Sequence, residues 1–133
     1  MPAVFVDTSA FFAILDRDDL HHAPAARLWK RTLDSGAPLF TSNYVVVETC
    51  ALLQRRNGMA AVRTLIEDIL PLIGIEWVTE ALHTAAILSA LSANRKGLSV
   101  VDCVSFAMMR AQGAKYALAF DLHFREQGFT APR

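Results

Sequence analysis

The chain has 133 residues, of which 53% are hydrophobic and 20% are charged. This composition excludes intrinsic disorder, which requires low hydrophobicity and a surplus of charge. The length suits one domain rather than two, so we expect a single domain over residues 1–133. Thirteen basic side chains balance thirteen acidic ones. A polyanion would therefore be bound by a local site and not by the global charge of the protein.

Cys50 and Cys103 are the two cysteines of the chain, which excludes a disulfide scaffold and indicates a reducing cytoplasm. The first residues lack the basic segment of a secretory signal, and no apolar run approaches the roughly 20 residues of a membrane span. We therefore expect a cytoplasmic protein without a membrane segment. The high apolar content, together with an amphipathic pattern from Met59 onward, predicts a partner surface and a homodimer.

In chain order, the pattern predicts a strand over 3–6, a helix over 10–16, a helix over 25–33, a strand over 38–41 and a helix from Ser42 to about 56. It continues with a helix over 59–70, a strand over 74–78, helices over 82–94 and 99–111, a strand over 116–120 and a short helix from 122. Thr8 and Ser9 offer an N-cap to the first helix, and Ser42 offers one to the third. Strands that alternate with helices of ten or more residues predict an α/β protein whose parallel sheet is covered on both faces.

Four of the thirteen acidic residues stand apart from the ordinary polar surface. Asp7 ends the first strand and Asp121 ends the last one. In a parallel sheet both positions lie at the carboxyl edge, where open α/β folds bind their ligands. Asp102 lies in a helix whose apolar side carries Phe106 and Met109. Glu48 lies mid-helix on the same face as four apolar or aromatic neighbours, so we expect its carboxylate to face the sheet.

Each of these carboxylates also has a purely structural explanation. Asp7 and Asp121 could cap the helices that follow them, Asp102 could sit in the first turn behind Ser99, and Glu48 could pair with a distant arginine. As a group, however, four acids that converge at one edge would repel each other and raise each other's pKa values. A hard, oxygen-liganded cation such as Mg²⁺ or Mn²⁺ relieves this repulsion, whereas no His and Cys spacing suits zinc. Such a site can activate water against a phosphodiester.

Four segments together resemble the PIN domain, and within it the VapC-type toxins of bacterial toxin–antitoxin pairs. They are residues 4–9 (VFVDTS), 41–49 (TSNYVVVET), 98–106 (LSVVDCVSF) and 119–124 (AFDLHF). The resemblance implies a three-layer α/β/α fold with a mainly parallel sheet of four to five strands. It implies a Mg²⁺- or Mn²⁺-dependent endoribonuclease that is silenced by a cognate antitoxin. The catalytic and metal-binding positions that match are Asp7, Glu48, Asp102 and Asp121, and the supporting polar positions are Thr8 and Ser99.

Contacts to RNA phosphates are expected from basic side chains near these segments. The candidates are Arg55, Arg56, Arg95, Lys96 and His123. Two other functions remain open at this point. One is a catalytically silent PIN-like module that acts through protein or RNA binding. The other is a phosphoacceptor domain, although Asp7 is a single acid after the first strand, and Lys115 precedes the last strand instead of following it.

Overall fold

The computed structural model describes residues 1–133, and a four-stranded sheet with only parallel neighbours lies at its centre. In space the strands are ordered β3 (Gly74–Glu76), β2 (Leu39–Ser42), β1 (Val4–Val6) and β4 (Tyr116–Leu118). Val4 lies opposite Leu39 on one side and opposite Tyr116 on the other. The predicted α/β class is confirmed, with four strands.

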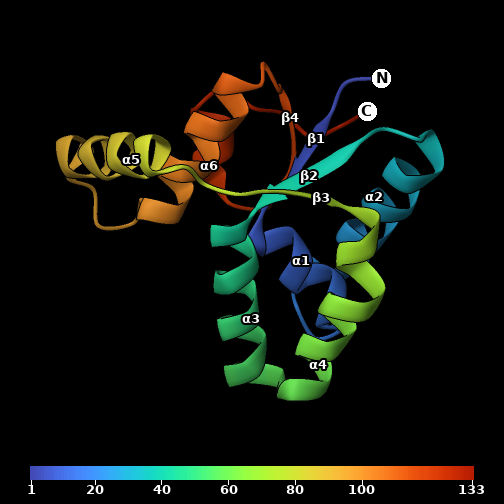
Figure 1. The fold of residues 1–133 in the computed structure, drawn as a ribbon. Helices are drawn as coiled ribbons and strands as arrows, with labels where there is room; N and C mark the ends of the chain where they lie inside the picture. The colour runs from blue at the N-terminus through green and yellow to red at the C-terminus, as the bar shows by residue number, and fades with distance from the viewer.

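Seven α-helices surround the sheet (Figure 1). They are α1 (Thr8–Leu15), α2 (His22–Ser35), α3 (Asn43–Asn57), α4 (Met59–Thr64), α5 (Glu80–Ala93), α6 (Val100–Ala111) and α7 (Leu122–Glu126). Helices α1, α3 and α4 pack together on one side of the sheet, and α6 lies on the other side. Helix α5 packs along α6 and projects from the body of the molecule. None of the helices combines the length and apolar character needed to cross a membrane.

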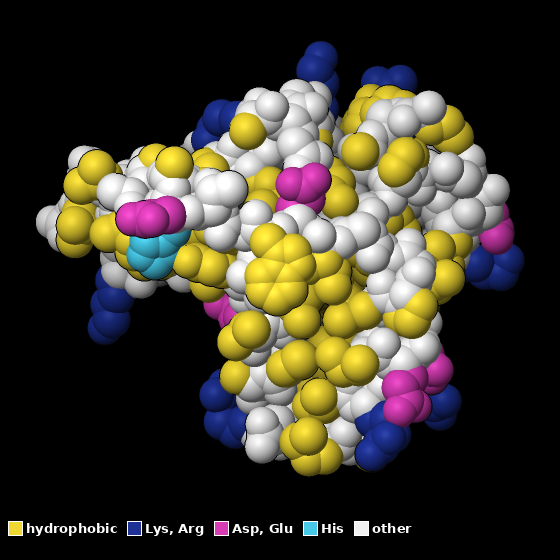
Figure 2. All heavy atoms as spheres, viewed as in Figure 1, with side chains coloured by type: hydrophobic (Ala, Val, Ile, Leu, Met, Phe, Trp, Pro, Cys, Tyr) yellow, Lys and Arg dark blue, Asp and Glu magenta, His cyan; other side chains and the backbone are white.

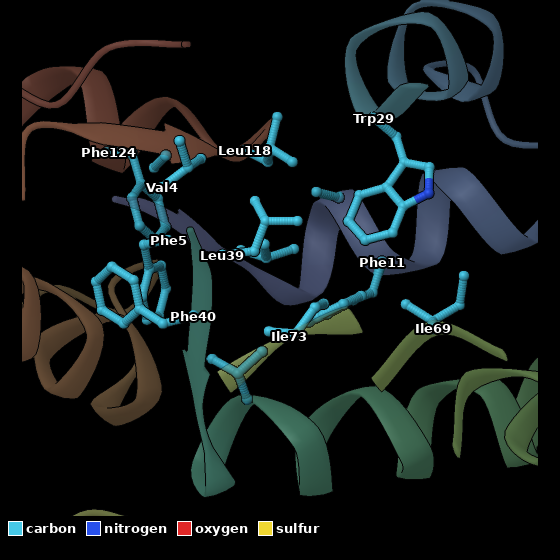
Figure 3. Close-up of a cluster of buried hydrophobic side chains, with 14 of the residues drawn as sticks. Val4, Phe5, Phe11, Trp29, Leu39, Phe40, Ile69, Ile73, Leu118 and Phe124 are labelled. Carbon is cyan, nitrogen blue, oxygen red and sulfur yellow. The ribbon is translucent and has the colours of Figure 1, made fainter. Parts of the chain in front are cut away.

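The core follows from the alternation of side chains along the short strands. Figure 3 shows Phe5, Phe40 and Phe124 on one side of the sheet, and Phe11 and Trp29 on the other. On the first side, the rings of Phe5 and Phe40 meet edge-to-face with centroids 5.3 Å apart. Because both faces of the sheet are covered at its centre, β1 is a continuous apolar run whose three residues are all buried.

Three elements differ from the sequence prediction for identifiable reasons. The helix expected over 59–70 ends as α-helix at Thr64 and continues as a π turn and a 3-10 turn, where Pro71 cannot extend an α-helix. The strand expected over 74–78 is short and exposed because it lies at the edge of the sheet. The last strand ends at Leu118, and the N–H of Phe120 bonds to the hydroxyl of Ser9 instead of to a strand.

Candidate active site

Three of the four acids are held at the starts of helices. Asp7 follows β1 and is the N-cap of α1, and Asp121 follows β4 and is the N-cap of α7. Since β1 and β4 are parallel neighbours, both carboxylates lie at the same edge of the sheet. Asp102 is the third residue of α6 and forms a capping box with Ser99. The structural explanations considered for these three residues are therefore confirmed, and the N-cap of α1 is Asp7 rather than Thr8 or Ser9.

Each cap occupies one carboxylate oxygen and leaves the other free. Oδ2 of Asp7 accepts from the N–H and the hydroxyl of Ser9, at 3.2 and 2.7 Å. Oδ2 of Asp102 accepts from the N–H of Ser99 at 3.1 Å, and Oδ1 of Asp121 accepts from the N–H of His123 at 2.9 Å. Every fully buried polar side-chain atom in the structure has a hydrogen-bond partner. The second oxygen of each carboxylate has no partner, so it is not fully buried and remains accessible. A cap thus orients each carboxylate without using up its capacity to bind a cation.

The electrostatics of the edge show that the four acids act on one another. Burial raises the pKa of Asp7 to about 7; the bonds from Ser9 oppose the rise, and the charges of Asp102 and Glu48 add to it. Burial also raises the pKa of Asp102, with further contributions from the charges of Asp121 and Glu48. None of the four takes part in a salt bridge. The protein therefore gathers negative charge here, and no basic side chain forms a salt bridge with any of the four acids.

The expectation that Glu48 faces the sheet is wrong. Helix α3 buries the stripe formed by Val45, Thr49 and Leu53, and Glu48 lies one position off that stripe. Its side chain is half-buried and lines an open hollow of about 360 Å³, together with Val101 at the start of α6. The distant arginine considered as a partner is not found. Glu48 therefore joins the other acids from the side of α3.

The carboxylates are not drawn together into a closed ligand set. No group of three or more His, Cys, Asp or Glu side chains is close enough to hold a metal ion as it stands. The donor chemistry nevertheless fits a hard divalent cation, because every candidate ligand is a carboxylate oxygen and three of these ligands have a free oxygen. Binding at this edge requires some of the side chains to turn toward the ion.

Hydroxyl groups position the acids, and the most informative one, that of Ser9, was not among the predicted site residues. Ser9 donates to Asp7 and accepts from the N–H of Phe120 at 2.9 Å, so it ties the start of α1 to the segment before Asp121. Its place two residues after a strand-ending Asp was the available signal. The hydroxyl of Thr8 does not bond to the acids; it accepts from Thr49 at 3.1 Å and thereby joins α1 to α3.

The five candidate RNA contacts fall into two groups. Arg55 and Arg56 are exposed in the last turn of α3, seven or more residues beyond Glu48, which is about 10 Å along a helix. The structure therefore does not bring them to the acidic edge. Arg95 and Lys96 lie in the loop between α5 and α6, immediately before the start of α6 that carries Asp102. These two remain next to the site.

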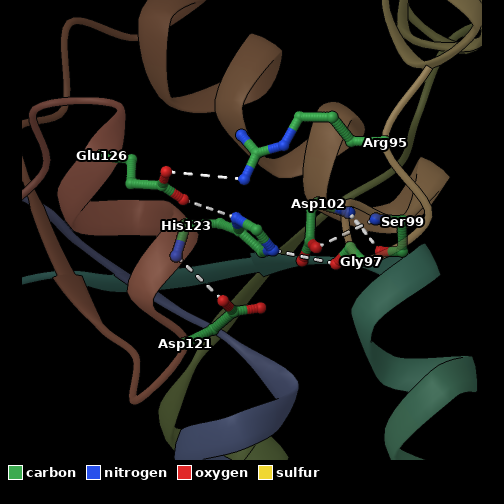
Figure 4. Close-up of polar contacts among 7 residues, drawn as sticks. All are labelled: Arg95, Gly97, Ser99, Asp102, Asp121, His123 and Glu126. Atoms are coloured by element: carbon green, nitrogen blue, oxygen red, sulfur yellow. Dashed lines mark hydrogen bonds and ion pairs between the residues drawn. The ribbon is translucent and has the colours of Figure 1, made fainter. Parts of the chain in front are cut away.

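His123 lies beside the acids and is already engaged. Its Nδ1 is 2.7 Å from Oε1 of Glu126, and its Nε2 is 2.9 Å from the carbonyl oxygen of Gly97 (Figure 4). Both partners accept, so the ring satisfies both only as an imidazolium. The bond to Glu126 is the main cause that raises the pKa of His123. The residue joins α7 to the loop before α6, and its ring is not free to contact RNA.

Together, the all-parallel sheet and its carboxyl edge define an α/β protein with an acidic site at the strand ends. The chain belongs to the PIN domain family, whose model matches residues 4–129. The resemblance drawn from the four sequence segments is thereby confirmed.

Within the family, the chain is similar over its whole length to a VapC toxin. It is 38% identical over 132 residues to the 23S rRNA-specific endonuclease VapC20 of Mycobacterium tuberculosis, covering 98% of both chains. The crystal structure of that protein, described as a sarcin-ricin loop cleaving toxin, matches with a TM-score of 0.83 at 36% identity over 98% of both chains. FitAcB from Neisseria gonorrhoeae shares the fold at 18% identity, with a TM-score of 0.66 over 97% of this chain and 96% of that one. VapBC2 from Rickettsia felis, bound to promoter DNA, shares it at 9%, with a TM-score of 0.67 over 96% of both.

Proposed function

We propose that this protein is a divalent-metal-dependent endoribonuclease and the toxin of a type II toxin–antitoxin system. The observation that carries the proposal is the set of three capped carboxylates, each with one free oxygen, at an edge that Glu48 joins and no basic side chain neutralises. The similarity to the endonuclease VapC20 over 98% of both chains supports it independently.

In this proposal Asp7, Glu48, Asp102 and Asp121 hold one or two ions of Mg²⁺ or Mn²⁺. When bound, such an ion supplies an activated water and stabilises the leaving oxygen of a phosphodiester. The chain itself orients the ligands. Ser9 fixes Asp7, and Ser99 fixes Asp102, so that the free oxygens present negative charge at the carboxyl edge. The raised pKa of Asp7 means that filling the site releases a proton near neutral pH.

Carboxamide variants test the proposal. Asp7→Asn and Asp102→Asn keep the cap geometry because an amide oxygen still accepts a hydrogen bond, but they remove ligand charge. We expect each variant to lose cleavage of RNA that depends on Mg²⁺ or Mn²⁺ while its circular dichroism stays unchanged. Asp68→Asn is the matched control, because Asp68 is an exposed acid outside the site. Full activity of both site variants, or of the wild type in excess chelator, would contradict the proposal.

The alternative is a silent PIN-like module that acts only through its partners. All four acids are present and unpaired, which favours the enzyme. Calorimetric titration separates the two functions. A nuclease of this type binds Mn²⁺ or Mg²⁺ with loss of binding in Asp7→Asn, whereas a protein that binds neither ion and cleaves no RNA is the silent module.

We further propose ribosomal RNA as the substrate class, because the whole-length relative is named for an endonuclease specific to 23S rRNA. Primer extension on RNA from cells that express the protein would locate the cut. A single new end in ribosomal RNA is the expected result. Ends confined to transfer or messenger RNA would reject this substrate class and leave the nuclease proposal standing.

A cognate antitoxin is the proposed protein partner, and the cytoplasm is the proposed location. The structural neighbours include toxin–antitoxin assemblies, which supports the partner. Two free cysteines are compatible with a reducing compartment.

We also propose a homodimer, and we propose α5 as its surface instead of the helix after Met59. The helix is mostly apolar, and Glu80 and His83 are its only acidic or basic residues. Ala86 is nevertheless its only buried residue. A helix that is apolar on nearly all sides is normally buried. Leu88 and Leu91 are 60% and 70% exposed on one side of it, and Figure 2 shows apolar surface on the projecting α5.

An uncharged apolar face is complementary to its own copy under twofold symmetry, so a second copy of this chain is the proposed occupant of the α5 face. Light scattering that shows a monomer at micromolar concentration would contradict this.

A further inference from the structure

Two hollows flank the segment that carries Asp121. One, of about 750 Å³, is lined in part by Arg95, His123 and Glu126. The other, of about 530 Å³, is lined in part by His21 and Phe129. Both share Phe120, Asp121, Leu122 and Arg125. We propose that this segment is a subsite for single-stranded RNA, in which His21 and Phe120 stack a nucleobase and Arg125 contacts the adjoining phosphate.

The aromatic part of the subsite is a stacked pair on the surface. The rings of His21 and Phe120 lie 4.8 Å apart with an angle of 13° between their planes. His21 is exposed and Phe120 is half-buried. Every nucleobase has a π-face, and aromatic side chains beside a nuclease site bind unpaired bases through that face. The pair is therefore a platform suited to a base that is turned out of the strand.

The platform is fixed relative to the acidic edge. The N–H of Phe120 donates to the hydroxyl of Ser9, and that hydroxyl donates to Asp7. Phe120 also directly precedes Asp121, whose carboxylate caps α7. A base held by Phe120 would therefore have a constant position relative to two of the four acids. This is the requirement for a subsite that sets which phosphodiester is cut.

Cationic side chains border the same segment. Arg125 is exposed and forms no salt bridge. Arg95 contacts Glu126 at 3.5 Å, and both side chains are 48% exposed, so the pair is weak. Since the chain has no net charge and the site itself is acidic, an RNA strand needs local cations to approach it. These arginines supply them on the side of the site formed by α7.

The pair could instead be packing alone, or the apolar hollow could receive a segment of a protein partner. RNA is favoured because both hollows share Asp121 with the acidic site and because an arginine without an acidic partner borders each of them. Exposed Leu122, at 71%, adds apolar surface that a base can cover. The inference rests on the proposed nuclease function and adds the residues that would choose its substrate.

Abasic substitution tests the platform. A single-stranded oligoribonucleotide that the wild type cleaves is prepared as a series, with one abasic ribose at each position around the cut. Loss of the stacked base is expected to raise KM at one position by about 5- to 150-fold. His21→Ala and Phe120→Leu should raise KM on the intact oligonucleotide by a similar factor. They should show no additional loss on the oligonucleotide abasic at that position, since the interaction is already gone. The proposal is overturned if the abasic substitution raises the KM of His21→Ala and Phe120→Leu by the same factor as it raises the KM of the wild type.

Two further measurements keep the failure of the subsite separate from the failure of the nuclease. Trp77→Leu, which removes an aromatic ring that is 75% exposed on another part of the surface, should leave KM unchanged. Fluorescence anisotropy without added divalent ion measures RNA binding alone, and there Arg125→Gln should reduce the slope of log Kd against log salt by about 0.7. If the acid variants lose cleavage while His21→Ala, Phe120→Leu and Arg125→Gln bind and cleave as the wild type does, the nuclease stands and the subsite is refuted. If the wild type cleaves no RNA, but His21→Ala, Phe120→Leu and Arg125→Gln each weaken the binding of a single-stranded oligoribonucleotide in the anisotropy measurement, the subsite stands and the nuclease is refuted.

Discussion

Replacing Asp7 with Asn should make the metal-free protein more stable at alkaline pH. Asp7 is 4% exposed, and its pKa is raised from 3.8 to about 7, chiefly by burial. The folded state therefore holds the proton of Asp7 more tightly than the unfolded chain does. Its contribution to stability is fully present below pH 3.8 and is lost as the pH rises through 7. Over that range the shift corresponds to about 4 kcal/mol in the free energy of unfolding.

An Asn side chain is neutral at every pH, and its oxygen can still accept both bonds from Ser9. In the presence of chelator, we expect Asp7→Asn to unfold with a free energy about 2–4 kcal/mol above that of the wild type at pH 8. The two proteins should be nearly equal at pH 4. Urea titration followed by the fluorescence of buried Trp29 measures this difference. Added Mg²⁺ should stabilise the wild type at pH 8 and leave the variant unchanged.

Asp68→Asn serves as the control, because the Asp68 carboxylate is exposed and its replacement should move stability by only a few tenths of a kcal/mol. An Asp7→Asn variant that is equal to the wild type, or less stable, at pH 8 in chelator would contradict this prediction. That result would mean that the charged carboxylate is stabilised by its surroundings and that the edge needs no cation.

Three other predictions concern the surroundings of the site. Ser9→Ala should lower the free energy of unfolding by about 1–3 kcal/mol, because a backbone N–H and a carboxylate oxygen both lose a partner. It should also move the pH profile of kcat/KM upward, because Ser9 lowers the pKa of Asp7, and Ser9→Thr should restore the profile. His123→Ala should reduce Tm at pH 6 and have little effect at pH 9, since the imidazolium that bonds two acceptors loses a proton as the pH rises through its raised pKa; an equal loss at both values would show that the ring acts only by packing. Leu91→Lys should give a monomer by light scattering with unchanged circular dichroism, whereas a persistent dimer would place the interface elsewhere than on α5.

The sequence predicted the positions of the acids along the chain better than their surroundings. Apolar runs and turn residues located all four strands, and with them Asp7 directly after β1 and Asp121 three residues after the end of β4. The burial of Glu48 was mispredicted, because apolar neighbours on a helix do not reveal which of two adjacent stripes packs inward. In α3 the buried stripe runs through Val45, Thr49 and Leu53, and only the packing of α1 against α3 decides that.

The sequence was therefore sufficient to predict the parallel α/β class and the acidic side chains at the edge of the sheet, since hydrophobic periodicity and side-chain type are local properties. Tertiary structure alone decided how the parts meet. Ser9 connects Asp7 to the segment before Asp121, although 111 residues separate it from Phe120. The ring of His123 is hydrogen-bonded to the carbonyl oxygen of Gly97, and Arg56 lies at the far end of α3 from the acids. Such contacts join segments far apart in the chain. They form only when the packed elements bring those segments together, so a local sequence pattern does not predict them.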